Sequence, residues 1–152
     1  MSSRIHVFNG PNLNLLGARE PKIYGHHTLQ DVEKLCRDVA ERHGLELVFR
    51  QTNAEYQMVE WLQEARLDAG IVINPAGFSY HAVPVLDALR MCEGVIVEVH
   101  ISNIHRREAE WRSKSIMTAA CTGMISGLGI NGYPLAVEHI AYRLAQSSAN
   151  EA

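Results

Sequence analysis

Residues 28–49, TLQDVEKLCRDVAERHGLELVF, predict one complete helix followed by one strand. Apolar side chains recur at positions 29, 32, 35, 36, 39 and 40, which is the spacing of one helical face. Thr28 and Asp31 have the pattern of a capping box, and Gly44 is the residue type that ends a helix. The apolar run Leu45–Phe49 then has the character of a buried strand.

The same alternation of short apolar runs and amphipathic stretches continues on both sides of this segment. Four more runs predict strands, at residues 5–8, 71–73, 95–99 and 124–126. Helices are expected after Asn53, from about Val83 with Pro84 in its first turn, and from about Pro134 through Leu144. Strands that alternate with helices form parallel sheets with right-handed crossovers. The predicted fold class is therefore α/β: a single-domain, flavodoxin-like, doubly wound five-stranded parallel sheet with helices on both faces.

Length and charge limit the kind of protein. The 152 residues, 47% of them apolar, suffice for one domain with its own core. We expect this flavodoxin-like domain at 1–146, followed by a frayed polar tail at 147–152. The 14 basic and 17 acidic side chains give a net charge of -3, which provides no field for phosphate backbones. A general nucleic-acid binder is excluded, and a small molecule or a protein is the expected partner.

Cysteine content and the N-terminus indicate the compartment. The three cysteines are odd in number and lie in apolar sequence, as expected of reduced core thiols in a cytosolic protein. The first residues lead into a strand without an apolar signal region, and no run reaches membrane-spanning length. We expect a soluble, cytoplasmic protein without membrane contact.

One connection is longer than the fold requires. Residues 11–26 exceed the usual strand-to-helix loop of about 2–6 residues, and such loops are often lids or binding loops. Gly17 and Gly25 could act as its hinges. The alternative is a surface excursion packed by Leu15 and Leu16.

Polar residues follow the first four predicted strands. They are Asn9 to Asn12, Gln51 to Asn53, Asn74 and the segment His100 to Asn103. Any one of them could be a turn or cap residue. Because the carboxyl ends of parallel strands meet at one edge, where ligands bind, four such segments instead predict an uncharged site for a small polyhydroxylated ligand.

Glu98 and His100 are two residues apart on one strand, so their side chains project from the same face. A carboxylate in a covered strand needs a partner, and an imidazole nitrogen is the nearest one. Such a carboxylate orients the ring of a catalytic histidine. The alternative is a structural pair without chemistry.

Arg19 and Tyr24 lie on the same long loop and could meet in space. A guanidinium held against the phenol would lower its pKa and make it a usable base. From this pair alone, an amphipathic loop anchor is the better interpretation of Tyr24.

Other motifs do not indicate chemistry. Gly127 to Gly132 match G-x-G-x-x-G, but too little chain follows for a dinucleotide fold, so we interpret the motif as a tight turn. No metal is expected, because neither the histidines nor the cysteines have zinc-type spacing. The lysines lie in polar contexts, which argues against a Schiff-base mechanism.

Taken together, the motifs resemble those of the type II 3-dehydroquinate dehydratases, or type II dehydroquinases, from about Ile5 to Leu144. The resemblance implies a flavodoxin-like fold, trimers arranged into a homo-dodecamer, and a reaction without metal or organic cofactor. The family dehydrates 3-dehydroquinate to 3-dehydroshikimate by anti elimination through an enolate, in aromatic biosynthesis through the shikimate pathway or in quinate catabolism. The matching segments are residues 9–17, Arg19-Glu20, residues 23–25, residues 49–51, residues 73–75, residues 98–103, Arg112 and residues 127–129.

The resemblance also implies catalytic roles. Tyr24 would be the base, with Arg19 favouring its ionised form. Asn12, through a water, would stabilise the enolate oxygen. His100, oriented by Glu98, would be the general acid that protonates the departing hydroxyl.

Binding roles follow in the same way. Asn74 and the N–H groups of Ile101 and Ser102 would hold the substrate carboxylate, and Arg112 a ring hydroxyl. An aspartate that matches Asp87 would reach in from a neighbouring subunit.

Three segments depart from the family pattern. Tyr80-His81-Ala82 stands where the family usually has His-Thr-Ser, so that Tyr80 takes the substrate contact, His81 swings in, or the contact is lost. Residues 53–56 and 113–116 also differ from the usual segments. Two alternatives therefore stay open: a diverged relative with weak activity or another cyclic hydroxy acid as substrate, and a non-enzymatic flavodoxin-like binding module.

Overall fold

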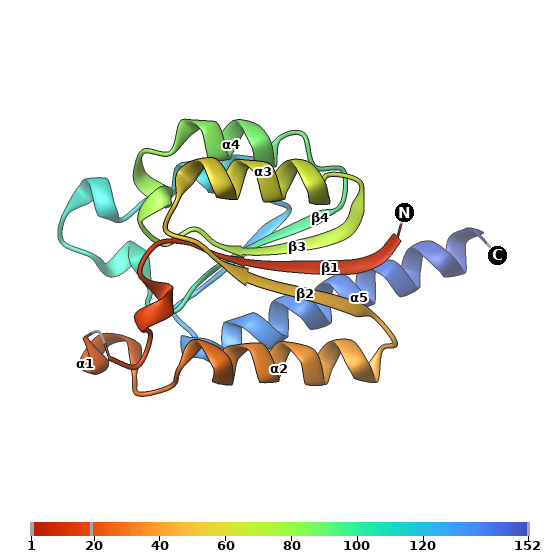
Figure 1. Cartoon of the computed structure of the whole chain (residues 1–152), viewed down its shortest axis with the longest axis horizontal. Coiled ribbons are helices and arrows are strands. Elements are labelled where there is room, and N and C mark those ends of the chain that lie inside the picture. Colours follow the sequence, from red (N-terminus) through yellow and green to blue (C-terminus); the bar gives the residue numbers. More distant parts are fainter. Residues whose placement is uncertain (1, 19, 152) are drawn as a thin grey trace.

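Five parallel strands form one sheet in the order β2-β1-β3-β4-β5 (Figure 1). The computed structural model describes residues 2–18 and 20–151, without the side chains of Ser2, Ile23 and Tyr24. All predicted strands are present. The strands are β1 Ser2–Asn9, β2 Glu46–Gln51, β3 Asp68–Asn74, β4 Val95–His100 and β5 Gly123–Ser126.

Helices cover both faces of the sheet, which confirms the predicted three-layer α/β fold (Figure 1). One face carries α2 and α5, and the opposite face carries α3 and α4. The α-helices are α1 Pro21–Tyr24, α2 Leu29–Arg42, α3 Glu55–Ala65, α4 Val83–Leu89 and α5 Gly132–Glu151. Short 3-10 helices are η1 Leu13–Leu15, η2 Ala76–Tyr80, η3 Ile104–Arg106, η4 Glu110–Arg112, η5 Ile116–Ala120 and η6 Gly129–Asn131.

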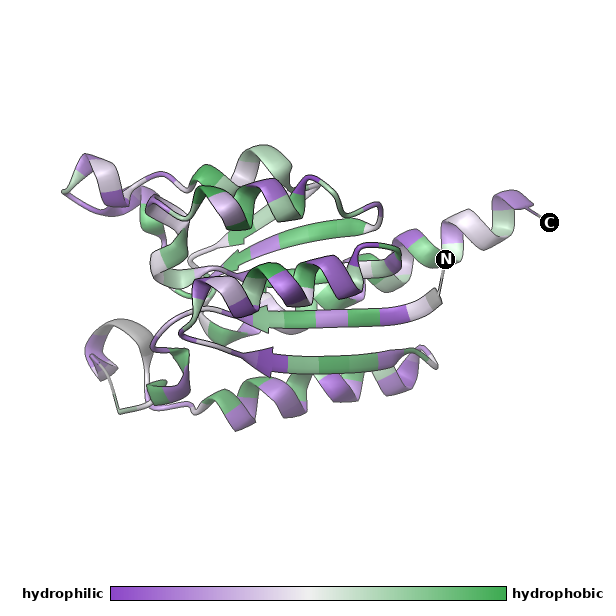
Figure 2. Ribbon diagram, turned by 45° about the horizontal axis from the view of Figure 1, so that its top comes forward, coloured by the Kyte–Doolittle hydropathy of each residue, from purple (hydrophilic) through white to green (hydrophobic). Residues whose placement is uncertain are grey.

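Two apolar cores lie on the two faces of the sheet (Figure 2). Val7 and Val97 point toward α2 and α5, whereas Phe8 and Ile96, one position along in each strand, point toward α3 and α4. The buried strands are therefore apolar on both sides, as parallel strands between two helical layers must be. All three cysteines are free thiols, and Cys36 is buried in the core between the sheet and helices α2 and α5.

The capping of α2 is as predicted. The backbone N–H of Asp31 donates to the hydroxyl of Thr28, and the N–H of Thr28 donates to the carboxylate of Asp31. Gly44 has φ +66°, the left-handed conformation that favours glycine after a helix. These local signals fix both ends of the helix.

The C-terminal segment differs from the prediction. Residues from Ser147 are not frayed but form the last turns of α5, which continues to Glu151 and projects beyond the sheet (Figure 1). The division into a domain at 1–146 and a tail at 147–152 stays a prediction. In the described residues, no helix combines the length and apolar character needed to cross a membrane.

The long connection at residues 11–26 contains two short helices, η1 and α1. Leu13 and Leu16 are buried and hold the connection against the core formed with α2 and α5. Leu15 is 54% exposed, contrary to the expected packing by Leu15 and Leu16. Gly17 has φ +95°, and a Cβ there would lie 3.0 Å from the carbonyl oxygen of His26. The middle of the connection, at Gly17, therefore lies against its C-terminal end at His26.

Candidate active site

A cavity of about 110 Å³ opens at the carboxyl edge of the sheet. The excursion at 11–26 and the segment at 103–115 lie at this end of the molecule (Figure 1). The position fits the sheet order, because the connections from β1 and β3 leave in opposite directions there. The lining residues are Asn12, Leu13, Leu16, Asn74, Ala76, Gly77, Tyr80, His100, Ile101, Ser102, Arg107 and Arg112.

His100 and Glu98 form the predicted pair at the end of β4. The ring Nε2 of His100 lies 2.6 Å from a carboxylate oxygen of Glu98, and both side chains are almost completely buried. A carboxylate only accepts, so Nε2 carries the proton and Nδ1 is the ring nitrogen left for a ligand. His100 lines the cavity, whereas Glu98 lies behind it.

Further donors hold Glu98. The Thr118 hydroxyl donates to its second carboxylate oxygen at 2.5 Å. Burial acts to raise the pKa of Glu98, but hydrogen bonds from His100, Ser115 and Thr118 outweigh it and hold the pKa below the ordinary value. Glu98 therefore stays ionised and holds the His100 ring through the hydrogen bond at Nε2.

Asn12 stands at the mouth of the cavity in a left-handed conformation, with φ 71°. Its N–H donates to the side-chain oxygen of Asn53 at 2.9 Å, and Gln51 donates to that same oxygen and to the carbonyl of Gly10. The polar residues after β2 thus do not line the cavity. They hold the backbone that presents Asn12.

Asn74 lies at the base of the cavity and is tied to residues that the sequence interpretation missed. Its Nδ2 donates to the hydroxyl of Tyr133, which donates in turn to Asn9. Asn9 is fully buried rather than part of the rim. Asn9 and Asn74 are paired residues at the ends of the neighbouring strands β1 and β3. Two asparagines in equivalent positions at two strand ends are the sequence signal that could have indicated a hydrogen-bonded link between them.

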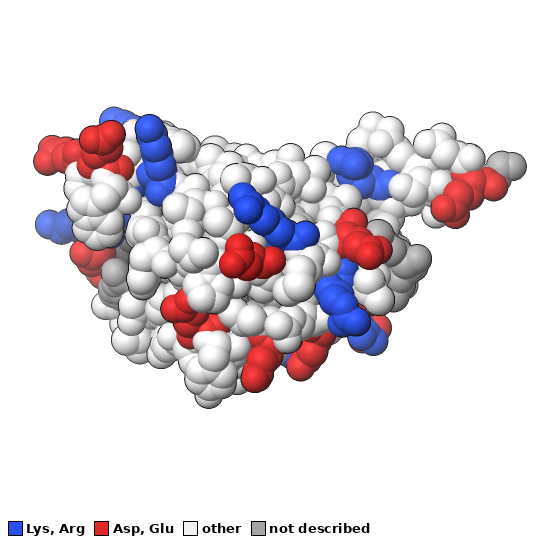
Figure 3. Space-filling model, turned by 90° about the horizontal axis from the view of Figure 1, so that it is seen from above, with Lys and Arg blue, Asp and Glu red and all other residues white. Residues whose placement is uncertain are grey.

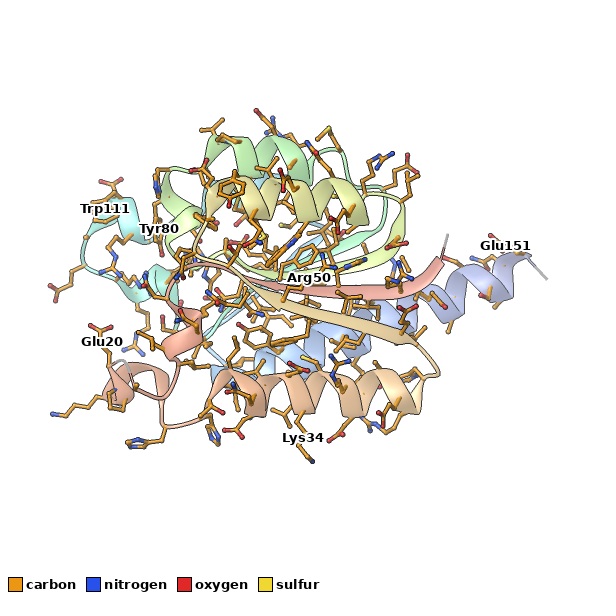
Figure 4. The ribbon with its side chains drawn as sticks, in the orientation of Figure 1. Glu20, Lys34, Arg50, Tyr80, Trp111 and Glu151 are labelled. Atoms are coloured by element: carbon orange, nitrogen blue, oxygen red, sulfur yellow. The ribbon has the colours of Figure 1, made fainter. Side chains whose placement is uncertain are left out.

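Tyr80 and Arg107 form a second polar pair in the cavity. Arg107 donates to the Tyr80 hydroxyl at 2.6 Å and to the Ser102 hydroxyl at 3.1 Å. Tyr80 also packs edge-on against Trp111, and Figure 4 shows both rings at the carboxyl end of the sheet. Arg107 was missed, because one arginine in a polar stretch carries no sequence signal.

Of the two candidates at positions 80 and 81, only Tyr80 lines the cavity. His81 is exposed and lies outside the lining. A substrate contact of Tyr80 stays a prediction.

Ile101 and Ser102 line the cavity directly after β4. Within the described part of the chain, neither N–H donates to a turn or loop carbonyl. The carbonyls of His100 and Ile101 accept from the N–H groups of Gly127 and Gly129. The glycine motif is thus a tight turn, as predicted, and it holds the segment that presents these groups.

Of the remaining predicted site residues, Arg112 is at the cavity and Asp87 is not. Arg19 and the side chain of Tyr24 lie outside the described residues. Asp87 is exposed on α4 and is not part of the cavity lining. Arg112 does line the cavity, with its guanidinium over the Trp111 ring at 5.7 Å.

The lining combines apolar side chains, such as Leu13 and Leu16, with polar and basic ones. Arg107 and Arg112 are the lining residues with a permanent charge, and no acidic side chain is among those described. Across residues 2–18 and 20–151, no three His, Cys, Asp or Glu side chains are grouped as a metal site. The cavity therefore suits an anion with several hydroxyl groups, in contact with an oriented histidine.

Comparisons with known proteins agree with one another. The family model "Dehydroquinase class II" matches residues 3–141. The chain is 51% identical to "3-dehydroquinate dehydratase 2" of Agrobacterium fabrum, over 93% of this chain and 97% of that relative. It is 54% identical to a "3-dehydroquinate dehydratase" of Streptomyces avermitilis, over 90% and 87%. A crystal structure of type II dehydroquinase from Propionibacterium acnes superposes with a TM-score of 0.88 at 43% identity, covering 93% and 98%.

Proposed function

The chain belongs to the class II dehydroquinase family, and we propose that it is a lyase that dehydrates 3-dehydroquinate to 3-dehydroshikimate. The observation that carries this proposal is the His100–Glu98 pair, with 2.6 Å between ring nitrogen and carboxylate, at a cavity lined by two guanidinium groups. An ionised Glu98 stabilises an imidazolium at His100. A protonated Nδ1 is then the general acid for the departing hydroxyl.

The elimination moves one proton to a base and one to the leaving group. Tyr24, whose ionised form Arg19 favours by the family resemblance, takes the proton from the carbon next to the ketone, and the electron pair forms an enolate. Asn12, through a water, stabilises the enolate oxygen. As the enolate collapses, the C–O bond breaks, a C=C bond forms, and the hydroxyl leaves as water with the proton of His100. The roles of Tyr24 and Arg19 rest on the family resemblance.

Substrate binding uses the other lining residues. Asn74 and the N–H groups of Ile101 and Ser102 hold the carboxylate, and Arg112 holds a ring hydroxyl. Tyr80 takes the place of the histidine that the family usually has. By the family resemblance, Asp87 of a neighbouring subunit completes the site, and the active form is a homo-dodecamer built from trimers.

The enzyme acts in the cytoplasm, where aromatic precursors are made and quinate is broken down. Its reaction is common to the two routes. Neither a metal nor an organic cofactor takes part in the proposed steps.

A direct assay tests the function. Purified protein incubated with 3-dehydroquinate should raise the ultraviolet absorbance of the conjugated enone, and Tyr24→Phe should abolish the rise. Tyr56→Phe, at a tyrosine that is 71% exposed on α3, is the matched control and should keep the wild-type rate. No rise with the wild-type protein would refute the proposal.

The Tyr80–Arg107 hydrogen bond supports one alternative, a relative that prefers another cyclic hydroxy acid. If so, Tyr80→His should increase kcat/KM for 3-dehydroquinate at least about tenfold, the effect of one hydrogen bond in a binding site. An unchanged or lower value would count against this alternative.

A further inference from the structure

We propose that Tyr133 is a positioning residue that fixes the Asn74 amide as a hydrogen-bond donor toward the cavity, where it binds the substrate carboxylate. The inference rests on the proposed function for the identity of the substrate. The arrangement of the donors is independent of it.

Four hydrogen bonds connect three strands and a helix beneath the cavity. Asn9 Nδ2 donates to the carbonyl of Arg50 at 3.0 Å, and the Tyr133 hydroxyl donates to Asn9 Oδ1 at 2.7 Å. Asn74 Nδ2 donates to the Tyr133 oxygen at 2.8 Å, and the N–H of Ala76 donates to Asn74 Oδ1 at 3.2 Å. The chain thus runs from β2 through β1, α5 and β3 to η2.

The direction of every bond is determined by the two ends. A backbone carbonyl only accepts, so Asn9 must turn its NH₂ toward Arg50 and its oxygen toward Tyr133. The single Tyr133 proton is then used on Asn9, and the phenol oxygen can only accept from Asn74. At the other end, the Ala76 N–H only donates and requires the oxygen of Asn74.

The fixed amide has one donor left. Its NH₂ group has two N–H bonds in one plane, and Tyr133 takes one of them. Asn74 is 4% exposed and lines the cavity, and Tyr133 is fully buried. The second N–H is therefore available to an acceptor in the cavity. A carboxylate oxygen is such an acceptor, and its negative charge makes the bond stronger than one to a neutral hydroxyl oxygen.

A purely structural role for Tyr133 predicts different behaviour. In that case its hydroxyl would contribute to stability, and its removal would affect the site in the same way whatever residue stands at position 74. A positioning role acts through the Asn74 amide alone. A double-mutant cycle between the two residues separates the two roles.

The experiment compares Tyr133→Phe, Asn74→Ala and the double variant in turnover of 3-dehydroquinate. A second readout is calorimetric binding of quinate, a cyclic hydroxy carboxylate that has no ring ketone and cannot eliminate water by this route. Tyr142→Phe is the matched control, since Tyr142 is an exposed tyrosine on α5 whose hydroxyl accepts from Gln146 at 2.8 Å. If Tyr133→Phe does not fold, Asn9→Leu tests the same chain, because it frees the Tyr133 proton to face the Asn74 donor.

We expect Tyr133→Phe to raise KM and the Kd of quinate about tenfold, the effect of one misplaced hydrogen bond, with a smaller change in kcat. In the Asn74→Ala background, Tyr133→Phe should have little further effect. Equal losses in both backgrounds, or a result like that of Tyr142→Phe, would overturn the inference while the function stands. Quinate binding that depends on Tyr133 without any turnover would refute the function alone, and neither binding nor turnover would refute both.

Discussion

Glu98 is a single buried carboxylate on which the arrangement of the site depends. It has no exposed surface, and an unpaired charge in such a place is strongly destabilising. Hydrogen bonds from Thr118 and His100 offset this cost on its two oxygens. The same contacts that make the charge tolerable also orient the imidazole, so stability and chemistry are linked in one side chain.

Replacing Glu98 by glutamine tests this link. The amide of Glu98→Gln can donate to Nε2 of His100, which would reverse the tautomer and remove the charge that favours imidazolium. We expect kcat to fall by about 10²–10⁴, the range for a misoriented catalytic histidine or a lost general acid. Steady-state kinetics on 3-dehydroquinate would measure it. Glu93→Gln, an exposed residue just before β4, is the control and should keep the wild-type kcat. Equal rates for the two variants would contradict the assigned role.

The low pKa of Glu98 also predicts how stability changes with pH. Burial works against ionisation, but the hydrogen bonds to the carboxylate prevail and place the folded pKa below the ordinary 4.5. Between these two values the unfolded chain binds a proton that the folded chain does not. Stability from this group is present above pH 4.5 and is lost as the pH falls through the folded pKa. In urea unfolding below pH 4.5, the free energy of unfolding of the wild-type protein should fall by up to about 1.4 kcal/mol per pH unit because of this group. The Glu98→Gln variant should lack this contribution. The same loss in both proteins would contradict the prediction.

At the level of residues, the sequence predicted contacts that follow from strand geometry. Glu98 and His100 meet because alternate residues of a strand share a face, which is a local rule. Arg107 and Tyr133 were missed, because their partners are 27 and 59 positions away and become neighbours only through tertiary packing. Tyr133 lies near the start of α5 and has the sequence pattern of a core residue. It is indeed fully buried, so only its hydroxyl contacts have a further role.

Among the elements, the turn after β5 supports the site from behind. Gly127 has φ +92°, and a Cβ there would lie 2.8 Å from Cβ of Asn103. The turn holds the carbonyls of His100 and Ile101. Its glycine is therefore required both by backbone conformation and by space.

Gly127→Ala should destabilise the fold by more than about 1 kcal/mol, the cost of a left-handed backbone, with an added clash. It should also lower kcat/KM, since Asn103 follows the segment that presents Ile101 and Ser102. Urea unfolding and steady-state kinetics would measure the two effects. Gly123→Ala is the matched control, because a Cβ there meets nothing within 4 Å. If both variants behave alike, the turn does not support the site.

Elements with several helical turns or a full strand were predicted, whereas short ones were not. In α2 the apolar period, the capping box and Gly44 agree, and the helix forms as expected. η1 has three residues and α1 four, too few for any period to be visible. The end of α5 was predicted to fray because residues 147–152 are polar, but an established helix extends through polar residues at little cost.

For the whole molecule, the sheet order decides where the site lies. β1 and β3 are neighbours whose following segments leave in opposite directions, and the cavity occupies the resulting crevice. Away from the cavity, basic and acidic side chains are interspersed on the face formed by α3 and α4 (Figure 3). At the cavity, by contrast, the lining residues with a permanent charge are both arginines, Arg107 and Arg112.

The proposed assembly can be tested by complementation. If Asp87 acts in the site of a neighbouring subunit, mixed oligomers of Asp87→Ala and His100→Ala contain some sites with both wild-type residues. We expect each variant alone to be nearly inactive and co-refolded mixtures to regain a measurable part of the wild-type kcat. A mixture no more active than its components, with mixed oligomers demonstrated by mass spectrometry, would show that the site is complete in one chain.

The contact at Gly17 has an evolutionary consequence. Because Gly17 lies against the carbonyl of His26, the chain leaves the scaffold after Gly17 and is back beside it at His26. A change of length between these two residues would leave the sheet register unaltered, but it would displace Tyr24, the proposed base. The fold therefore leaves this segment free to vary, and the chemistry does not.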